Sequence, residues 1–148
     1  MSAPSNLTGD FQPPPGLLGN LASVMAGGAV GTLLRVSGHA LRPQAPGTFP
    51  WTTLAENLLG AFLLGWLAAW LLARTVGTSS PEDINAHRLR LFLTTGVLGS
   101  FTTFSALAVE GIELVALAPG TGFAYLGTSL ALGPLLAVAG LRVGGRTP

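Results

Sequence analysis

The chain has 148 residues, of which 49% are hydrophobic and only 9% carry a charge, with a formal net charge of +1 at neutral pH. Soluble domains carry about 25% charged residues, so this composition predicts a membrane protein and gives no reason to expect nucleic-acid binding. The chain has no cysteine, which excludes disulfides and thiolate metal sites.

Residues 1–15, MSAPSNLTGDFQPPP, are polar and rich in proline, and they lack the basic start of a secretory signal. We expect a disordered tail that is not cleaved. A membrane domain at 16–142 follows, with four apolar segments at about 16–36, 51–74, 90–117 and 122–142, and residues 143–148 form a short tail. A hydrocarbon core of about 30 Å needs about 20 apolar residues in helical form. The expected fold is therefore an all-α membrane protein with four transmembrane helices.

In the first span, Gly27 and Gly31 form a G-x-x-x-G pattern, which favours close helix packing. In the second span, the apolar run contains Asn57, which either cements a helix interface or presents an amide donor to a pore. Glu56 precedes it and is a candidate for an intramembrane carboxylate. Its place about a turn and a half after Trp51 also fits the membrane interface.

The third span contains GVLGSFTTFSALAVEG at 96–111, where four hydroxyls fall within six residues: Ser100, Thr102, Thr103 and Ser105. Two interpretations are open. The glycines and hydroxyls break the helix, so that carbonyls face a cation and N–H groups favour an anion. Alternatively, the helix is continuous and its hydroxyls bond to carbonyls one turn earlier. We expect Glu110 and Glu113 to reach the interface from the far end of the span.

In the fourth span, Tyr125 and Ser129 are one turn apart and share a face, which fits either a hydrogen-bonding line or an interfacial aromatic beside a packing serine. With four spans, one side of the membrane holds five arginines and the other holds Arg35 and Arg42; the five are Arg74, Arg88, Arg90, Arg142 and Arg146. The positive-inside rule then places both termini in the cytoplasm, and we expect a multi-pass protein of the inner (plasma) membrane.

Three motifs together resemble the fluoride channel family, often called Fluc or CrcB. The family's first-span pattern, GGxxGxxxR, matches GGAVGTLLR at 27–35. Its second-span pattern, NxxGxF, matches NLLGAF at 57–62, and its third-span pattern, close to GxxGxxTTFSTF, matches GVLGSFTTFSAL at 96–107. Order, spacing and the four-span plan agree, so the likeness covers residues 17–142.

The resemblance implies an antiparallel dimer of two inverted subunits with two fluoride pores, in which the third helix is broken near its middle. It also implies a structural Na⁺ at the dimer centre, held by backbone carbonyls that by position belong to Gly99 and Thr102. Asn57 is then expected to donate to fluoride, and Arg35 is expected at the vestibule. The remaining pore lining is expected from Phe104, Thr103, Ser105, Tyr125 and Ser129; the ring edge of a phenylalanine is positive and can face an anion.

The chain departs from the family pattern at two neighbouring positions. The family's second phenylalanine is Leu107 here, and the threonine before it is Ala106. Leucine has no ring quadrupole, and the one-sided arginines argue against dual topology. We therefore weigh a heterodimer with a paralogous subunit of opposite orientation against a homodimer. In either form the expected function is a fluoride-selective channel that lowers cytoplasmic fluoride by passive export, confers fluoride resistance and is not an enzyme.

Two other classes remain open at this point. A small four-span drug–proton antiporter needs a midplane carboxylate, conventionally in its first span, but residues 16–36 contain no acid, so only Glu56 could serve. A non-conducting partner subunit of a fluoride channel heterodimer is the other class. It predicts fluoride flux only when the partner is present, unaffected by changes at Asn57 or Phe104.

Overall fold

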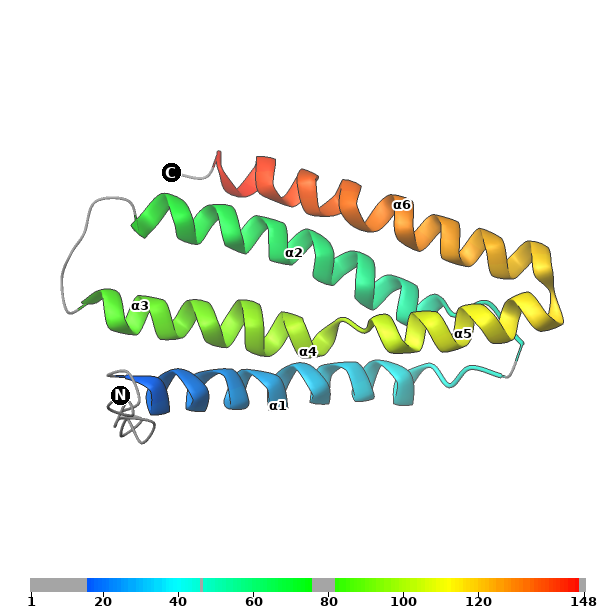
Figure 1. Ribbon diagram of the computed structural model, residues 1–148, viewed down its shortest axis with the longest axis horizontal. Coiled ribbons are helices and arrows are strands. Elements are labelled where there is room, and N and C mark those ends of the chain that lie inside the picture. The colour runs from blue at the N-terminus through cyan, green and yellow to red at the C-terminus, as the bar shows by residue number, and fades with distance from the viewer. Residues whose placement is uncertain (1–15, 46, 76–81, 147–148) are drawn as a thin grey trace, which may run out of the picture.

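A computed structural model describes residues 16–45, 47–75 and 82–146, so the expected tail at 1–15 lies outside the described residues. Every regular element in these ranges is a helix (Figure 1): α1 (Leu17–Leu41), α2 (Trp51–Thr75), α3 (Glu82–Arg90), η1 (Leu91–Leu98), α4 (Gly99–Phe101), α5 (Phe104–Leu117) and α6 (Pro119–Gly144). Four stretches are long and apolar enough to cross a membrane, at Leu17–Leu41, Trp51–Ala73, Ile84–Leu117 and Pro119–Gly144. The prediction of an all-α protein with four transmembrane helices is confirmed.

The four spans pack as two pairs. α2 packs mainly on α6, α1 packs mainly on η1, and α5 also packs on α6. The beginning of α1 and the end of α6 lie at the same end of the bundle (Figure 1). Because a Cβ atom at Gly27 would collide with the carbonyl oxygen of Phe92, and one at Gly31 with that of Val97, these glycines let α1 and η1 touch. The close packing predicted from the G-x-x-x-G pattern is therefore confirmed.

The third span is broken in its middle. η1 is a π-helix and leads directly into α4, but the next two residues are extended: Thr102 has ψ 152° and Thr103 has φ −146° and ψ 118°. Helical hydrogen bonding resumes at Phe104, and the gap is visible between α4 and α5 (Figure 1). The broken-helix interpretation of the hydroxyl-rich segment is thus correct, and the continuous-helix interpretation is wrong.

The buried core is small and lies next to this break. It is formed by Leu54, Leu107 and Tyr125, which come from α2, α5 and α6, and neighbouring apolar side chains pack around it: Phe49, Leu58 and Leu126. The Phe49 ring, in the loop before α2, meets the Tyr125 ring edge-on with centroids 5.5 Å apart. This core fixes the beginning of α2 against α5 and α6 at the level of the break.

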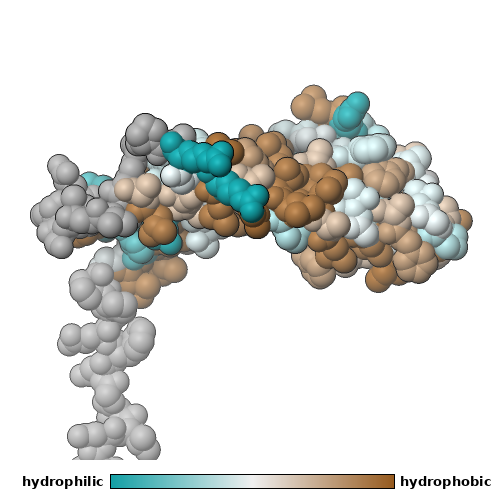
Figure 2. All heavy atoms as spheres, turned by 90° about the horizontal axis from the view of Figure 1, so that it is seen from above, coloured by the Kyte–Doolittle hydropathy of each residue, from teal (hydrophilic) through white to brown (hydrophobic). Residues whose placement is uncertain are grey.

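Most of the apolar surface stays outside the core. At most 28% of the residues in the most apolar window of any span are buried within the chain, and large apolar side chains cover much of the face shown in Figure 2. Phe104 and Ile112 on α5 are 75% and 70% exposed. Contiguous apolar surface of this kind marks a membrane or protein interface, so lipid or another chain must cover these helices.

Candidate functional site

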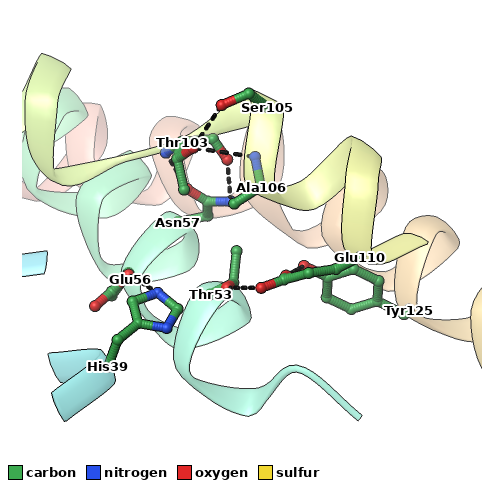
Figure 3. A network of polar contacts seen from close by, with 9 residues as sticks. All are labelled: His39, Thr53, Glu56, Asn57, Thr103, Ser105, Ala106, Glu110 and Tyr125. Carbon is green, nitrogen blue, oxygen red and sulfur yellow. Dashed lines mark hydrogen bonds and ion pairs between the residues drawn. The ribbon is translucent and has the colours of Figure 1, made fainter. Parts of the chain in front are cut away.

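Asn57 in α2 holds the extended backbone between α4 and α5 (Figure 3). Its Nδ2 donates to the carbonyl oxygen of Thr103 at 2.9 Å, and its Oδ1 accepts from the backbone N–H of the same residue at 2.7 Å. Both backbone groups of Thr103 are thereby satisfied at a depth where an unsatisfied group costs several kcal/mol. Since an amide carries two N–H hydrogens, Asn57 can hold the break and still offer one donor to a ligand.

The same contacts release two carbonyl groups. In a continuous α-helix the N–H of Thr103 would donate to the carbonyl of Gly99, four residues earlier, but it donates to Asn57 instead. The N–H of Ala106 would likewise serve the carbonyl of Thr102, but it donates to the Thr103 hydroxyl at 3.2 Å. Gly99 and Thr102 therefore lose their helical donors. Their oxygen dipoles are of the kind that can replace the hydration shell of a cation.

The other side of the break is the beginning of α5. Thr103 caps this helix through its hydroxyl, which also lies 3.2 Å from the hydroxyl of Ser105. The first N–H groups of a helix have no partner within it and carry partial positive charge, which here belongs to Phe104 and Ser105. The break thus presents carbonyl oxygens at the end of α4 and N–H groups at the beginning of α5, the two polarities that suit a cation and an anion.

A hollow of about 160 Å³ lies beside the break and is lined by Asn57, Leu58, Thr103, Phe104, Leu107, Ser129 and Gly133. The structure therefore brings four of the predicted pore residues to one place, from α2, α5 and α6. A second hollow of about 220 Å³ lies against Phe104 and Leu107 and is lined otherwise by apolar side chains: Ala108, Ile112, Leu126 and Leu130. Phe104 borders both hollows, with its ring largely exposed.

Glu110 differs from its sequence expectation. It does not reach out to the interface: its Oε1 accepts from the Thr53 hydroxyl at 2.8 Å and its Oε2 accepts from the Tyr125 hydroxyl at 2.8 Å (Figure 3). Sequence reasoning missed Thr53 and Glu110 as members of the site. The available signal was Thr53, which lies one helical turn before Asn57 and so shares its face.

The remaining predicted residues lie around this centre. Tyr125 is fully buried, and its carbonyl accepts from the hydroxyl of Ser129 at 2.8 Å. Tyr125 therefore packs behind the residues that line the hollow and is not one of them. Arg35 lies on α1, outside the set of side chains that line the hollow. Glu113, which was expected to reach outward, is exposed.

Glu56 belongs to a separate cluster. Its carboxylate faces the last turn of α1, where the Nε2 of His39 lies 3.4 Å from its Oε2 (Figure 3). Glu56 is 6% exposed. Within the part of the chain that the structure describes, no group of three or more His, Cys, Asp or Glu side chains is placed to hold a metal ion. A cation at the break in the third span would therefore depend on backbone oxygens.

Known proteins match the chain over most of the membrane domain. The model of the family described as CrcB-like protein, Camphor Resistance (CrcB), matches residues 22–141. Three similar proteins are named fluoride-specific ion channels. The one from Rhizobium meliloti is 39% identical over 128 residues, 85% of this chain and 96% of its own length. That from Rubrobacter xylanophilus is 42% identical over 130 residues, covering 85% and 82%, and one from Thermus thermophilus is 44% identical over 124 residues, covering 82% and 92%.

Proposed function

The chain belongs to the CrcB-like family, and from this membership we propose that it is a fluoride-selective ion channel that lowers cytoplasmic fluoride by passive export. The observation that carries the proposal for this chain is the break in the third span. The Asn57 amide, the N-terminus of α5 and the Phe104 ring, whose edge is positive, meet at one hollow.

The lining conducts because it is neutral. A fixed cation inside the membrane would hold fluoride tightly, whereas conduction requires binding that is strong enough for entry and weak enough for release. Amide, hydroxyl and ring-edge donors replace part of the hydration shell of the ion without trapping it. The proposed activity involves no covalent chemistry and therefore no enzymatic step.

The direction of transport follows from the membrane potential. At acid external pH, hydrogen fluoride enters the cell by diffusion and dissociates inside. Each elementary charge that crosses the membrane is worth about 2.3 kcal/mol per 100 mV. A passive anion path therefore lets the negative interior drive fluoride outward without coupling to another ion.

We further propose that a second subunit of opposite orientation covers the exposed apolar face of α5, as a copy of this chain or as a paralogue. The released carbonyls of Gly99 and Thr102 would then hold a structural Na⁺ at the dimer centre. Support comes from the donor set, since hard cations prefer oxygen ligands. The ion would fix the two breaks against each other, and it has no part in moving fluoride.

The protein is a multi-pass membrane protein, and we propose the plasma membrane with both termini in the cytoplasm. The beginning of α1 and the end of α6 lie at one end of the bundle (Figure 1). Five of the seven arginines lie in the chain segments at that end: Arg74, Arg88, Arg90, Arg142 and Arg146. The excess of positive charge faces the cytoplasm.

Fluoride efflux from liposomes that contain this chain alone tests the proposal, with a fluoride electrode and a parallel chloride measurement. We expect rapid release of fluoride and none of chloride. Phe104→Leu should slow fluoride efflux about two- to tenfold, because the ring-edge contact is worth about 0.5–1.5 kcal/mol. Phe123→Leu is the matched control, since Phe123 is 64% exposed on α6 and outside both hollows.

A chain that releases no fluoride alone, but does so with a paralogous subunit, would favour the partner-subunit class that Leu107 raises. In that case the Phe104→Leu variant of this chain decides its role. Unchanged efflux from the mixed channel would mean that this chain only supports its partner. Reduced efflux would place at least one conducting path along α5 of this chain.

A further inference from the structure

Glu56 is a buried acid that the proposed fluoride path does not use. It lies in α2 between two residues of the site, three positions after Thr53 and one before Asn57, but its side chain faces α1. A Cβ atom at Gly38 would collide with its Oε1, and neither carboxylate oxygen accepts a hydrogen bond from the described residues. The hydroxyl of Thr52, one turn earlier, is also buried without a partner among them. A buried carboxylate is costly unless it is paired or protonated.

Among the residues that the structure describes, the side chain in ion-pairing contact with Glu56 is His39. Its Nε2 lies 3.4 Å from Oε2 of the carboxylate, and its side chain is 37% exposed, so protons can reach it from water. Arg35 lies one turn earlier on α1, and its charge also acts on Glu56. From the other helices packed around α2, Glu110 of α5 and Tyr125 of α6 are the ionisable groups on this side. η1 and α4 contain no ionisable residue.

We propose that His39 and Glu56 together form a proton-binding site that sets the charge at this end of the fluoride path, so that fluoride flux rises as pH falls. The inference rests on the proposed channel function. The direction of the pH dependence is the same whichever partner takes up the proton. Charging the imidazole and neutralising the carboxylate both make the cluster more positive by one unit. A more positive cluster beside Thr53 and Asn57 attracts an anion, and a more negative one repels it.

The pH range follows from the chemistry of histidine, whose charge ordinarily changes between about pH 5 and 8. At the alkaline end the pair carries the negative charge of Glu56, and the positive charge of Arg35 acts on it from α1. At the acid end one more proton is bound to the pair, and the cluster no longer repels fluoride. The channel would thus conduct best under the acid conditions in which hydrogen fluoride accumulates in the cell.

The test is fluoride efflux from liposomes with equal pH on both sides, compared between about pH 5.5 and 8, a range that brackets the histidine titration. The full chain should release fluoride about two- to tenfold faster at the acid end, the range for one charge acting at the effective dielectric of a protein surface. Glu56→Gln removes the carboxylate charge and should bring efflux at the alkaline end up to the acid value of the unmodified chain. His39→Gln keeps the carboxylate charge and should leave efflux at the alkaline end at the slow value.

His87→Gln is the matched control, because His87 is exposed on α3, far along the chain from the cluster, and should keep the full pH dependence. Equal fluoride efflux at both pH values from the unmodified chain would overturn this inference and leave the channel function standing. Absence of fluoride-selective efflux at every pH, from the chain alone and from the chain with a paralogous subunit, would overturn both. Glu56→Gln that leaves efflux at the alkaline end at the slow value would also overturn the inference.

Discussion

Asn57 and Thr103 are joined by two hydrogen bonds in opposite directions, one from the side-chain amide to the backbone carbonyl at 2.9 Å and one from the backbone N–H to the amide oxygen at 2.7 Å. The Asn57 side chain thereby supplies the hydrogen bonds that neighbouring helical turns would give Thr103 in an unbroken third span. This pair explains how a polar, extended segment exists inside an apolar bundle. It also makes Asn57 a structural residue as well as a proposed donor to fluoride.

Replacing Asn57 by alanine should lower both stability and fluoride efflux. The change removes two hydrogen bonds, and since single bonds inside membrane proteins average about 0.6 kcal/mol and reach about 1.7, we expect the free energy of unfolding to fall by about 1–3 kcal/mol. Thermal unfolding in detergent measures the loss. Asn85→Ala is the control, since Asn85 is exposed on α3. Equal stability of the two variants would contradict the role of the pair.

Thr103→Val should destabilise the beginning of α5. Valine has the shape of threonine but cannot accept from the N–H of Ala106, and loss of such a cap costs about 1 kcal/mol. Thr103→Ser keeps the acceptor and should behave like the unmodified chain in thermal unfolding and in fluoride efflux. If serine fails as badly as valine, loss of the cap does not by itself account for the destabilisation.

The pair of donors to Glu110 should be energetically coupled. Thr53→Val and Tyr125→Phe each remove one hydrogen bond to the carboxylate, and each should lower the free energy of unfolding by about 1–2 kcal/mol. The double variant leaves the carboxylate with neither donor, so its loss should differ from the sum of the single losses. Unfolding of all four proteins in one detergent gives the coupling. Glu113→Gln, an exposed position nearby, should change little.

Gly31→Ala should disrupt the contact between α1 and η1, because the new methyl group would collide with the carbonyl of Val97. Overpacking of this kind costs about 1–3 kcal/mol. Gly127→Ala on α6 adds the same methyl group where nothing lies within 4 Å, and it should be neutral or slightly stabilising, since alanine is the better helix former by about 1 kcal/mol. A similar effect of both changes would mean that the contact is not close-packed in the membrane.

From the residue pattern alone the break could be predicted only as one of two options, and the resemblance to the family favoured it. Ser and Thr bond readily to their own helix backbone, as the Thr102 hydroxyl does to the carbonyl of Leu98 at 3.0 Å, so hydroxyls alone do not reveal a break. What decides the case is Asn57, which lies 46 residues earlier in the chain. A sequence pattern carries no information on whether two such segments meet.

For Glu110 the sequence-based prediction was wrong. Its place late in an apolar span suggested a side chain that reaches for water, and nothing near it in sequence offers a donor. The two hydroxyls that satisfy it come from α2 and α6. Donors that come from other helices cannot be found by reading along one helix.

The sequence by itself determined the number of spans, their order and the family, because apolar length and the glycine and hydroxyl motifs are local properties of the chain. It also indicated Asn57, Phe104 and Ser129 as members of one site. Only the tertiary structure decided that the third helix breaks at Thr102 and Thr103, and that Glu110 and Glu56 are both turned inward to different partners. The physical reason is that a polar group inside a membrane must be satisfied by whatever donor or acceptor packing brings to it, and packing joins residues far apart in the chain.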